Sequence, residues 1–221
     1  MDTANLIQSI AINALPVLFA ITLHEAAHGY AARHFGDNTA WKMGRVSLNP
    51  TRHIDPVGTV LMPLLMGWLS SWTFLFGYAK PVPVRFGNLR NPKRDMIWVA
   101  LAGPAANLVQ ALVWGALFYV LALGRIDEPF FTGMCRAGFN VNVALFVFNL
   151  FPLPPLDGGR ILVGLLPTRS AMTFARIEPY GFFIVLALIY LRVLDAFWIT
   201  PLMAITKMLL NLVLSPLSLL L

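Results

Sequence analysis

The chain has 221 residues, of which 58% are hydrophobic and only 12% are charged, whereas soluble domains average about a quarter charged residues. This composition excludes an ordinary soluble domain and indicates a membrane protein whose surroundings are the lipid bilayer. The 16 Lys and Arg outnumber the 10 Asp and Glu, but they form short clusters between apolar runs, as in cytoplasmic loops, so we expect no nucleic-acid partner. Cys135 is the only cysteine, so a metal must be held by His, Asp or Glu.

Six apolar runs follow one another along the chain. A hydrocarbon core of roughly 30 Å needs about 20 residues of helix to cross it. Five of the runs are interpreted as membrane helices: 4–35, 96–123, 138–151, 180–194 and 197–220. The sixth, 54–78, is irregular because Pro56, Pro63 and Gly67 interrupt it. The sequence therefore predicts an all-α polytopic membrane protein of five to six transmembrane helices.

The loop charges predict the orientation of these helices. Residues 33–55 and 79–95 carry an excess of Lys and Arg, whereas the charges in residues 124–137 balance. Under the positive-inside rule, the two basic loops lie in the cytoplasm and the N-terminus lies outside. The run 54–78 then cannot cross once, and we expect it to be re-entrant. An ordinary sixth span stays open as the alternative, because the rule is statistical.

The first predicted helix carries a metal-binding motif. His24-Glu25-Ala26-Ala27-His28 is an HExxH sequence, and a spacing of four residues puts both histidines on one face of a helix. Two imidazoles in this arrangement can bind one Zn²⁺, with Glu25 placed as general base. Because ionisable side chains inside a membrane helix are costly and usually mark a functional site, we favour catalysis over a role in helix packing.

A catalytic zinc site usually has three protein ligands and one open position, so a third ligand is needed. His34 follows the second motif histidine by six residues, as in metzincin proteases. That pattern requires a glycine where this chain has Ala31, and in a continuous helix His34 faces another side. His53 and Asp55 are more simply explained as turn residues before Pro56.

Asp157 is the remaining candidate for the third ligand. It follows the proline-rich stretch 152–155, which cannot continue a regular helix. His24 lies about 11 residues, roughly 16 Å, before the cytoplasmic end of its helix, and the irregular chain after the fourth run can fold back to a similar depth. Asp157 precedes two glycines, so a helix N-cap or a turn residue is the alternative.

Three motifs in a fixed order make the chain resemble the site-2 protease family of intramembrane zinc metalloproteases. They are HEAAH, then Gly103-Pro104-Ala105-Ala106-Asn107, then Asn149 followed by Pro152, Pro154 and Leu156-Asp157-Gly158. The resemblance covers roughly residues 15–165. It implies one Zn²⁺ per chain, bound by His24, His28 and Asp157, and it implies that Asn149 helps to hold the substrate or the developing oxyanion.

The resemblance also implies the activity. We expect a zinc metalloprotease that hydrolyses peptide bonds within or near transmembrane segments of single-span membrane proteins. The chain 1–221 is expected to form one membrane-embedded domain, with a catalytic core at about 4–165, a C-terminal helical pair at about 179–221, and neither a PDZ domain nor a CBS pair. For 103–107 we favour small residues that let helices approach closely over direct contact with substrate.

Two other functions use the same residues. A metal-ion transporter could bind its cargo with His and Asp ligands, although it would gain nothing from Glu25 placed as a base. An inactive scaffold could bind zinc and membrane partners. The loop charges place the expected protease in the cell membrane as a multi-pass protein, with its active site nearer the cytoplasmic side. The substrate and the oligomeric state stay open.

Overall fold

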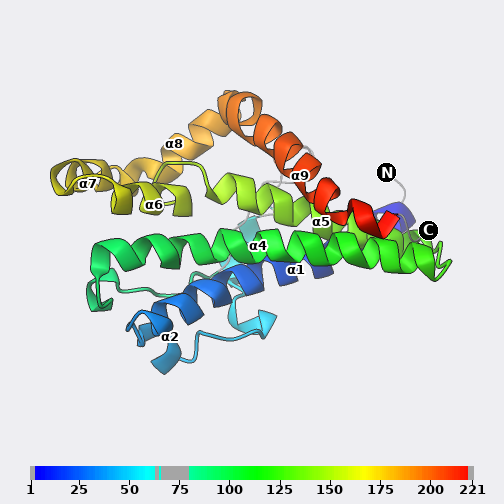
Figure 1. Ribbon diagram of the computed structural model, residues 1–221, viewed down its shortest axis with the longest axis horizontal. Coiled ribbons are helices and arrows are strands. Elements are labelled where there is room, and N and C mark those ends of the chain that lie inside the picture. The colour runs from blue at the N-terminus through cyan, green and yellow to red at the C-terminus, as the bar shows by residue number, and fades with distance from the viewer. Residues whose placement is uncertain (1–2, 63–64, 66–79, 219–221) are drawn as a thin grey trace.

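The computed structural model describes residues 3–62, 65 and 80–218. All regular elements assigned within these ranges are helices or helical turns, and Figure 1 shows how the helices are arranged. The three longest helices are α1 (Thr3–His34), α4 (Pro92–Leu123) and α5 (Pro129–Asn149). The shorter helices are α2 (Thr39–Lys42), α6 (Asp157–Leu165), α7 (Thr168–Ala175), α8 (Glu178–Tyr190) and α9 (Thr200–Ser218). Short 3-10 or π-helical turns lie at Pro50–Arg52, Pro56–Leu61, Phe86–Asn88 and Asp195–Ile199.

Two of the long helices begin earlier than the apolar runs suggest. α4 starts at Pro92 and α5 at Pro129, each with proline in its first turn, where the fixed φ favours helix and the missing N–H costs nothing. In α5 the charge of Arg136 interrupts the apolar pattern. Its guanidinium lies 5.3 Å from the ring centroid of Phe118, a cation–π contact with α4, and Arg is itself a good helix former.

Helices α1, α4 and α5 pack against one another in pairs and form the centre of the molecule (Figure 1). α6 and α9 pack on α4, and α9 also contacts α5. A buried cluster joins α4, α5 and α9 through Ala111, Val143, Val147 and Leu210. The centre of the molecule therefore joins segments that lie far apart in the sequence.

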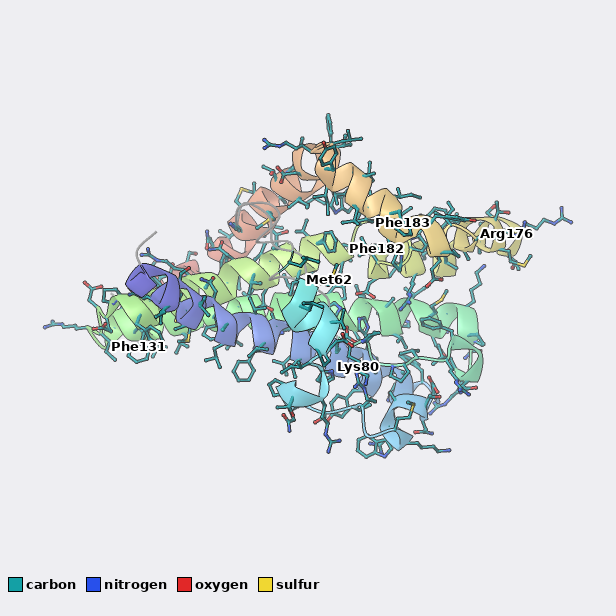
Figure 2. All side chains as sticks on the ribbon, turned by 180° about the vertical axis from the view of Figure 1, so that it is seen from behind. Met62, Lys80, Phe131, Arg176, Phe182 and Phe183 are labelled. Atoms are coloured by element: carbon teal, nitrogen blue, oxygen red, sulfur yellow. The ribbon has the colours of Figure 1, made fainter. Side chains whose placement is uncertain are left out.

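Four helical stretches are long and apolar enough to cross a membrane: 7–34, 92–123, 129–149 and 195–218. The pair α7–α8, bent by 65°, would supply a fifth. Large apolar side chains point outward along these helices, including Phe131 at 49% and Phe183 at 67% exposure (Figure 2). An apolar exterior of this kind suits lipid rather than water. The prediction of an all-α polytopic membrane protein is confirmed.

The C-terminal helices differ from the predicted pair in one respect. The run 180–194 yields a helix of only 13 residues, α8, which spans about 20 Å and is shorter than a hydrocarbon core. The chain turns at Arg192, whose φ is +57°, and a π-helical turn then leads into α9. Trp198 in that turn donates from its indole N–H to the carbonyl of Val147, at 2.9 Å, which fastens the start of α9 to α5.

The residues on either side of the irregular run 54–78 are in contact. The backbone N–H of Lys80 donates to the carbonyl oxygen of His53 at 3.0 Å, so the chain returns to where it left. A single crossing of the membrane by the run between them would separate these two residues by roughly 30 Å, so this hydrogen bond favours the re-entrant run over an ordinary sixth span. Most of the run itself lies outside the described residues.

Asp37 joins the two basic loops at the end of α1. Its buried carboxylate accepts hydrogen bonds from the N–H and hydroxyl of Thr39, the backbone N–H of Arg85 and the side-chain amide of Asn88. Burial alone would raise the pKa of Asp37, but these hydrogen bonds outweigh it and hold the pKa below its usual value. The carboxylate is therefore charged at neutral pH and fastens residues 85–88 to the loop after α1.

Candidate metal centre

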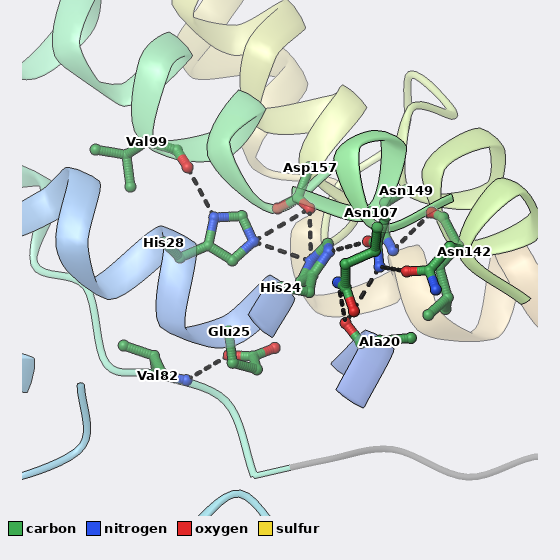
Figure 3. A network of polar contacts seen from close by, with 12 residues as sticks. Ala20, His24, Glu25, His28, Val82, Val99, Asn107, Asn142, Asn149 and Asp157 are labelled. Atoms are coloured by element: carbon green, nitrogen blue, oxygen red, sulfur yellow. Dashed lines mark hydrogen bonds and ion pairs between the residues drawn. The ribbon is translucent and has the colours of Figure 1, made fainter. Parts of the chain in front are cut away.

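Helix α1 presents two histidines on one face (Figure 3). The Nε2 atoms of His24 and His28 are 3.0 Å apart, one helical turn along α1, as the spacing of the motif predicts. The two imidazole rings meet edge to face with 4.6 Å between their centroids. Both side chains are nearly buried, with 10% and 12% of their surface exposed.

Asp157 is the first residue of α6, and its carboxylate faces both histidines. Its Oδ2 lies 3.2 Å from Nε2 of His24 and 3.3 Å from Nε2 of His28. The start of α6 is pressed against the proline-rich break, because a Cβ on Gly159 would lie 2.0 Å from the backbone nitrogen of Pro154. The N-cap alternative for Asp157 does not hold: the cap position is occupied by the preceding leucine, and no side chain caps α6.

The outer nitrogens of the two imidazoles determine which tautomers are present. Nδ1 of His24 lies 2.6 Å from the amide oxygen of Asn107, and Nδ1 of His28 lies 2.7 Å from the carbonyl oxygen of Val99. Since both partners can only accept, each Nδ1 carries the proton. The two Nε2 atoms therefore point lone pairs toward Asp157.

Three electron-pair donors thus converge at one point. Their separations of 3.0, 3.2 and 3.3 Å are close to the spacing of about 3.3–3.5 Å between the ligands of a tetrahedral zinc ion. Within the described part of the chain, no group donates a hydrogen bond to the buried Oδ2 of Asp157. A buried anionic oxygen without a donor, next to two lone pairs, is unfavourable unless a cation lies between them. The donor set therefore fits a zinc ion.

Asn107 on α4 holds the ring of His24 through a chain of amides (Figure 3). While its oxygen accepts from His24, its NH₂ group donates to the carbonyl of Ala20 at 3.1 Å and to Oδ1 of Asn142 at 2.9 Å. Asn142 in turn donates to the carbonyl of Gly138 at 2.9 Å. Sequence reasoning missed these two asparagines as supports of the metal centre, although fully buried amides inside apolar helices are a signal of function.

Gly103 explains how α4 approaches the histidines so closely. A Cβ at this position would lie 2.3 Å from Nε2 of His28 and 2.6 Å from Nε2 of His24, which is closer than atoms can pack. The segment 103–107 therefore combines two roles: the glycine leaves room for the imidazoles, and the asparagine orients one of them. This agrees with the close approach of helices expected from its small residues.

Glu25 lies in the same cavity as the three converging atoms. The cavity has a volume of about 290 Å³ and is lined by residues of α1, α4, α6 and the stretch 81–86. One oxygen of Glu25, Oε2, accepts a hydrogen bond of 2.7 Å from the backbone N–H of Val82. A carboxylate beside the candidate ligands is the arrangement that the HExxH motif predicts.

Asn149, the last residue of α5, lines the same cavity. Its Nδ2 donates to the carbonyl of Leu145, one turn back, at 3.0 Å. A side-chain amide has two N–H donors, so this hydrogen bond leaves one of them for a group in the cavity. The structure thus places Asn149 beside the ligands predicted from the sequence.

The other histidines considered from the sequence lie outside the cluster. His53 contacts the carbonyl of Ser47 through its Nε2 at 2.8 Å, and Asp55 caps the turn at Pro56–Leu61. Among the described residues, only His24, His28 and Asp157 bring three possible ligand atoms together, all within 4.8 Å of one another. His34 takes no part, as predicted.

Comparison with known proteins places this geometry in a family. The sequence profile of Peptidase family M50 matches residues 130–192. YwhC of Bacillus subtilis is 37% identical over 179 residues, which cover 79% of this chain and 78% of YwhC. Rip2 of Mycolicibacterium smegmatis is 32% identical over 78% of this chain and 64% of its own length.

Both relatives carry the name of a zinc metalloprotease. No solved structure matches the chain at a comparable level of significance. The match to YwhC spans most of both chains, and the family profile covers the helix that leads to Asp157. The chain therefore belongs to peptidase family M50, the site-2 protease family, and is a metalloprotease.

Proposed function

We propose that the chain hydrolyses peptide bonds within or near the transmembrane segments of single-span membrane proteins, as a step of regulated intramembrane proteolysis. The observation that supports this most is the shared cavity. A carboxylate suited to act as a base and three converging ligand atoms face one space of about 290 Å³, in a protein whose long helices have apolar exteriors.

One zinc ion per chain is proposed to be held by His24, His28 and Asp157. Bound there, it would supply a Lewis acid and lower the pKa of a water molecule from 15.7 toward about 7. Asn107 and the carbonyl of Val99 keep the two imidazoles oriented for this role.

The residues around the centre carry the rest of the reaction. Glu25 takes a proton from the attacking water and later delivers it to the leaving amine. Asn149 donates its second amide N–H to the oxygen that gains negative charge as the carbonyl is attacked. A helical substrate must unwind locally first, because a regular helix hides the scissile carbonyl in backbone hydrogen bonds.

The location follows from the loop charges. The chain is proposed to lie in the cell membrane as a multi-pass protein, with the cavity nearer the cytoplasmic side, where the two basic loops meet. Its partners are then the bilayer and single-span substrates that enter laterally from lipid.

The decisive experiment is co-expression with a panel of tagged single-span proteins. Wild type should shorten at least one of them, and Glu25→Gln should not, because the amide keeps the shape of the carboxylate but cannot carry the proton. Zinc content should be equal in the two proteins. Cleavage by Glu25→Gln at more than a few per cent of the wild-type rate would overturn the proposal.

A further inference from the structure

The stretch Lys80-Pro81-Val82-Pro83-Val84 lies beside the HExxH helix and has an unusual backbone. Proline has no N–H, so Val82 carries the only backbone donor between residues 81 and 83. A residue before proline is also driven toward extended conformations, and both Lys80 and Val82 precede prolines. The sequence therefore favours an extended segment with a single backbone N–H donor at its centre, on Val82.

That donor is directed at the proposed base. The N–H of Val82 lies 2.7 Å from Oε2 of Glu25 (Figure 3), a short, charge-assisted hydrogen bond. A glutamate side chain is otherwise flexible, with several rotatable bonds. Holding one carboxylate oxygen restricts these rotations and leaves the other oxygen, Oε1, to receive a proton.

Residues 80–84 are themselves held in place by contacts with the loop after α1. Nη2 of Arg45 donates to the carbonyl of Lys80 at 2.9 Å, and the N–H of Lys80 donates to the carbonyl of His53 at 3.0 Å. The side chain of Val82 is buried at 7% exposure and belongs to the same cluster as Val46. The donor is therefore fixed by the loop after α1.

The glycine after the motif permits this contact. A Cβ on Gly29 would lie 2.7 Å from Cγ2 of Val46 and 3.2 Å from Cγ1 of Val82. Only a residue without a side chain lets both valines rest on α1 one turn beyond Glu25. The hydrogen bonds of Lys80 and the packing of the Val82 side chain thus fix the position of the Val82 N–H.

We propose that Val82 is a positioning residue for the general base: its N–H fixes Oε2 of Glu25 so that Oε1 faces the reacting water. This inference rests on the proposed function of Glu25. It assigns to the stretch 80–84 a part in the rate of the chemical step, which is distinct from binding the metal or covering the cavity.

The test compares two substitutions in detergent-purified protein. Val82→Pro removes the N–H, whereas Val82→Ala keeps it and loses only side-chain packing. The substrate is a tagged single-span protein whose cleavage depends on Glu25. Val82→Pro should lower kcat for this substrate by about 10- to 100-fold, with KM and zinc content unchanged. Val82→Ala, which keeps the N–H but loses packing against Val46, should lower kcat much less than Val82→Pro does.

The same contact can be measured without substrate or metal. Hydrogen exchange at the Val82 amide can be followed by NMR in protein labelled with ¹⁵N-valine. This amide should be protected in wild type and in Glu25→Gln, whose side-chain oxygen still accepts, and should exchange faster in Glu25→Ala. Equal exchange in all three proteins would show that the contact is not maintained.

The remaining outcomes also test the inference. If Val82→Pro does not fold, the α-hydroxy analogue of valine, introduced at position 82 by nonsense suppression, replaces the N–H by an ester oxygen and keeps the side chain. Equal kcat in this protein and wild type overturns the inference, and a higher kcat shows that the contact restrains the base instead. If wild type and Glu25→Gln cleave equally, the proposed function fails and not only this inference.

Discussion

At the scale of single residues, the metal centre depends on one acidic side chain. The two histidines of α1 lie one turn apart and offer two ligand atoms, and Asp157 provides the third from a different helix. Three protein ligands are the usual number in a catalytic zinc site. Without the carboxylate, a zinc ion bound there would lose both the charge that balances it and one of its coordinate bonds.

We predict that Asp157→Ala lowers the zinc content of detergent-purified protein from about one per chain to a small fraction of that value. Elemental analysis by mass spectrometry measures it directly. Asp127→Ala, which removes an exposed carboxylate from the loop after α4, should leave the zinc content unchanged. Equal zinc in wild type and Asp157→Ala would remove Asp157 from the ligand set.

A second prediction concerns the residue behind a ligand. Asn107→Ala deletes the acceptor for Nδ1 of His24, so the ring loses its orientation and its preferred tautomer. Zinc affinity should fall about 10- to 100-fold, measured by competition with a chelator of known affinity. Asn140→Ala, an exposed asparagine on α5, is the control and should bind as wild type does. Wild-type affinity in Asn107→Ala would show that the amide chain serves packing alone.

The residues of the site differ in how far along the sequence their partners lie. His24 and His28 are readable from the sequence because four residues of helix place them together, and Asp157 is readable from its chemistry and the break before it. Asn107 and Val82 are not, since their contacts with α1 join residues 83 and 57 positions apart. Such contacts depend on how helices and loops pack, which no short pattern encodes.

At the scale of elements, the close approach of α1 and α4 builds the centre. The two helices can meet at the histidines only because position 103 has no side chain. The sequence indicates small residues here but does not specify which helix they face. The element boundaries show the same limit, since α5 begins well before its apolar run and α8 ends before its run does.

We therefore predict that Gly103→Ala disrupts zinc binding while a similar change elsewhere does not. The new methyl group would lie within 2.3–2.6 Å of both Nε2 atoms, so the imidazoles or the whole of α4 must move. Zinc content and proteolysis should both fall at least tenfold. Gly87→Ala is the matched control, because a Cβ there has no neighbour within 4 Å. Full zinc content in Gly103→Ala would mean that the two helices separate easily.

At the scale of the whole molecule, the long helices separate two ends of the structure. α1 and α4 run in opposite directions, and α1 begins and α9 ends near the end of the molecule where α4 finishes (Figure 1). The two basic loops meet at the other end, where Asp37 and Asn88 join them. α4 has 32 residues and is about 48 Å long, enough to separate the ends across a bilayer of about 40–45 Å.

This arrangement predicts the labelling of single cysteines in intact cells. In a Cys135→Ala background, cysteines at Lys42 and Arg90 should be closed to a membrane-impermeant maleimide until the cells are opened, because the positive-inside rule predicts that both loops lie in the cytoplasm. A cysteine at Asp127 should react at once from outside.

Because Lys80 and His53 are hydrogen-bonded, positions 42 and 90 must behave alike whichever way the protein inserts. Reaction of all three positions in the opposite sense would invert the orientation and move the cavity toward the outer face. Reaction of 42 and 90 from different sides would contradict the fold itself, since the run 54–78 would then have to cross the membrane.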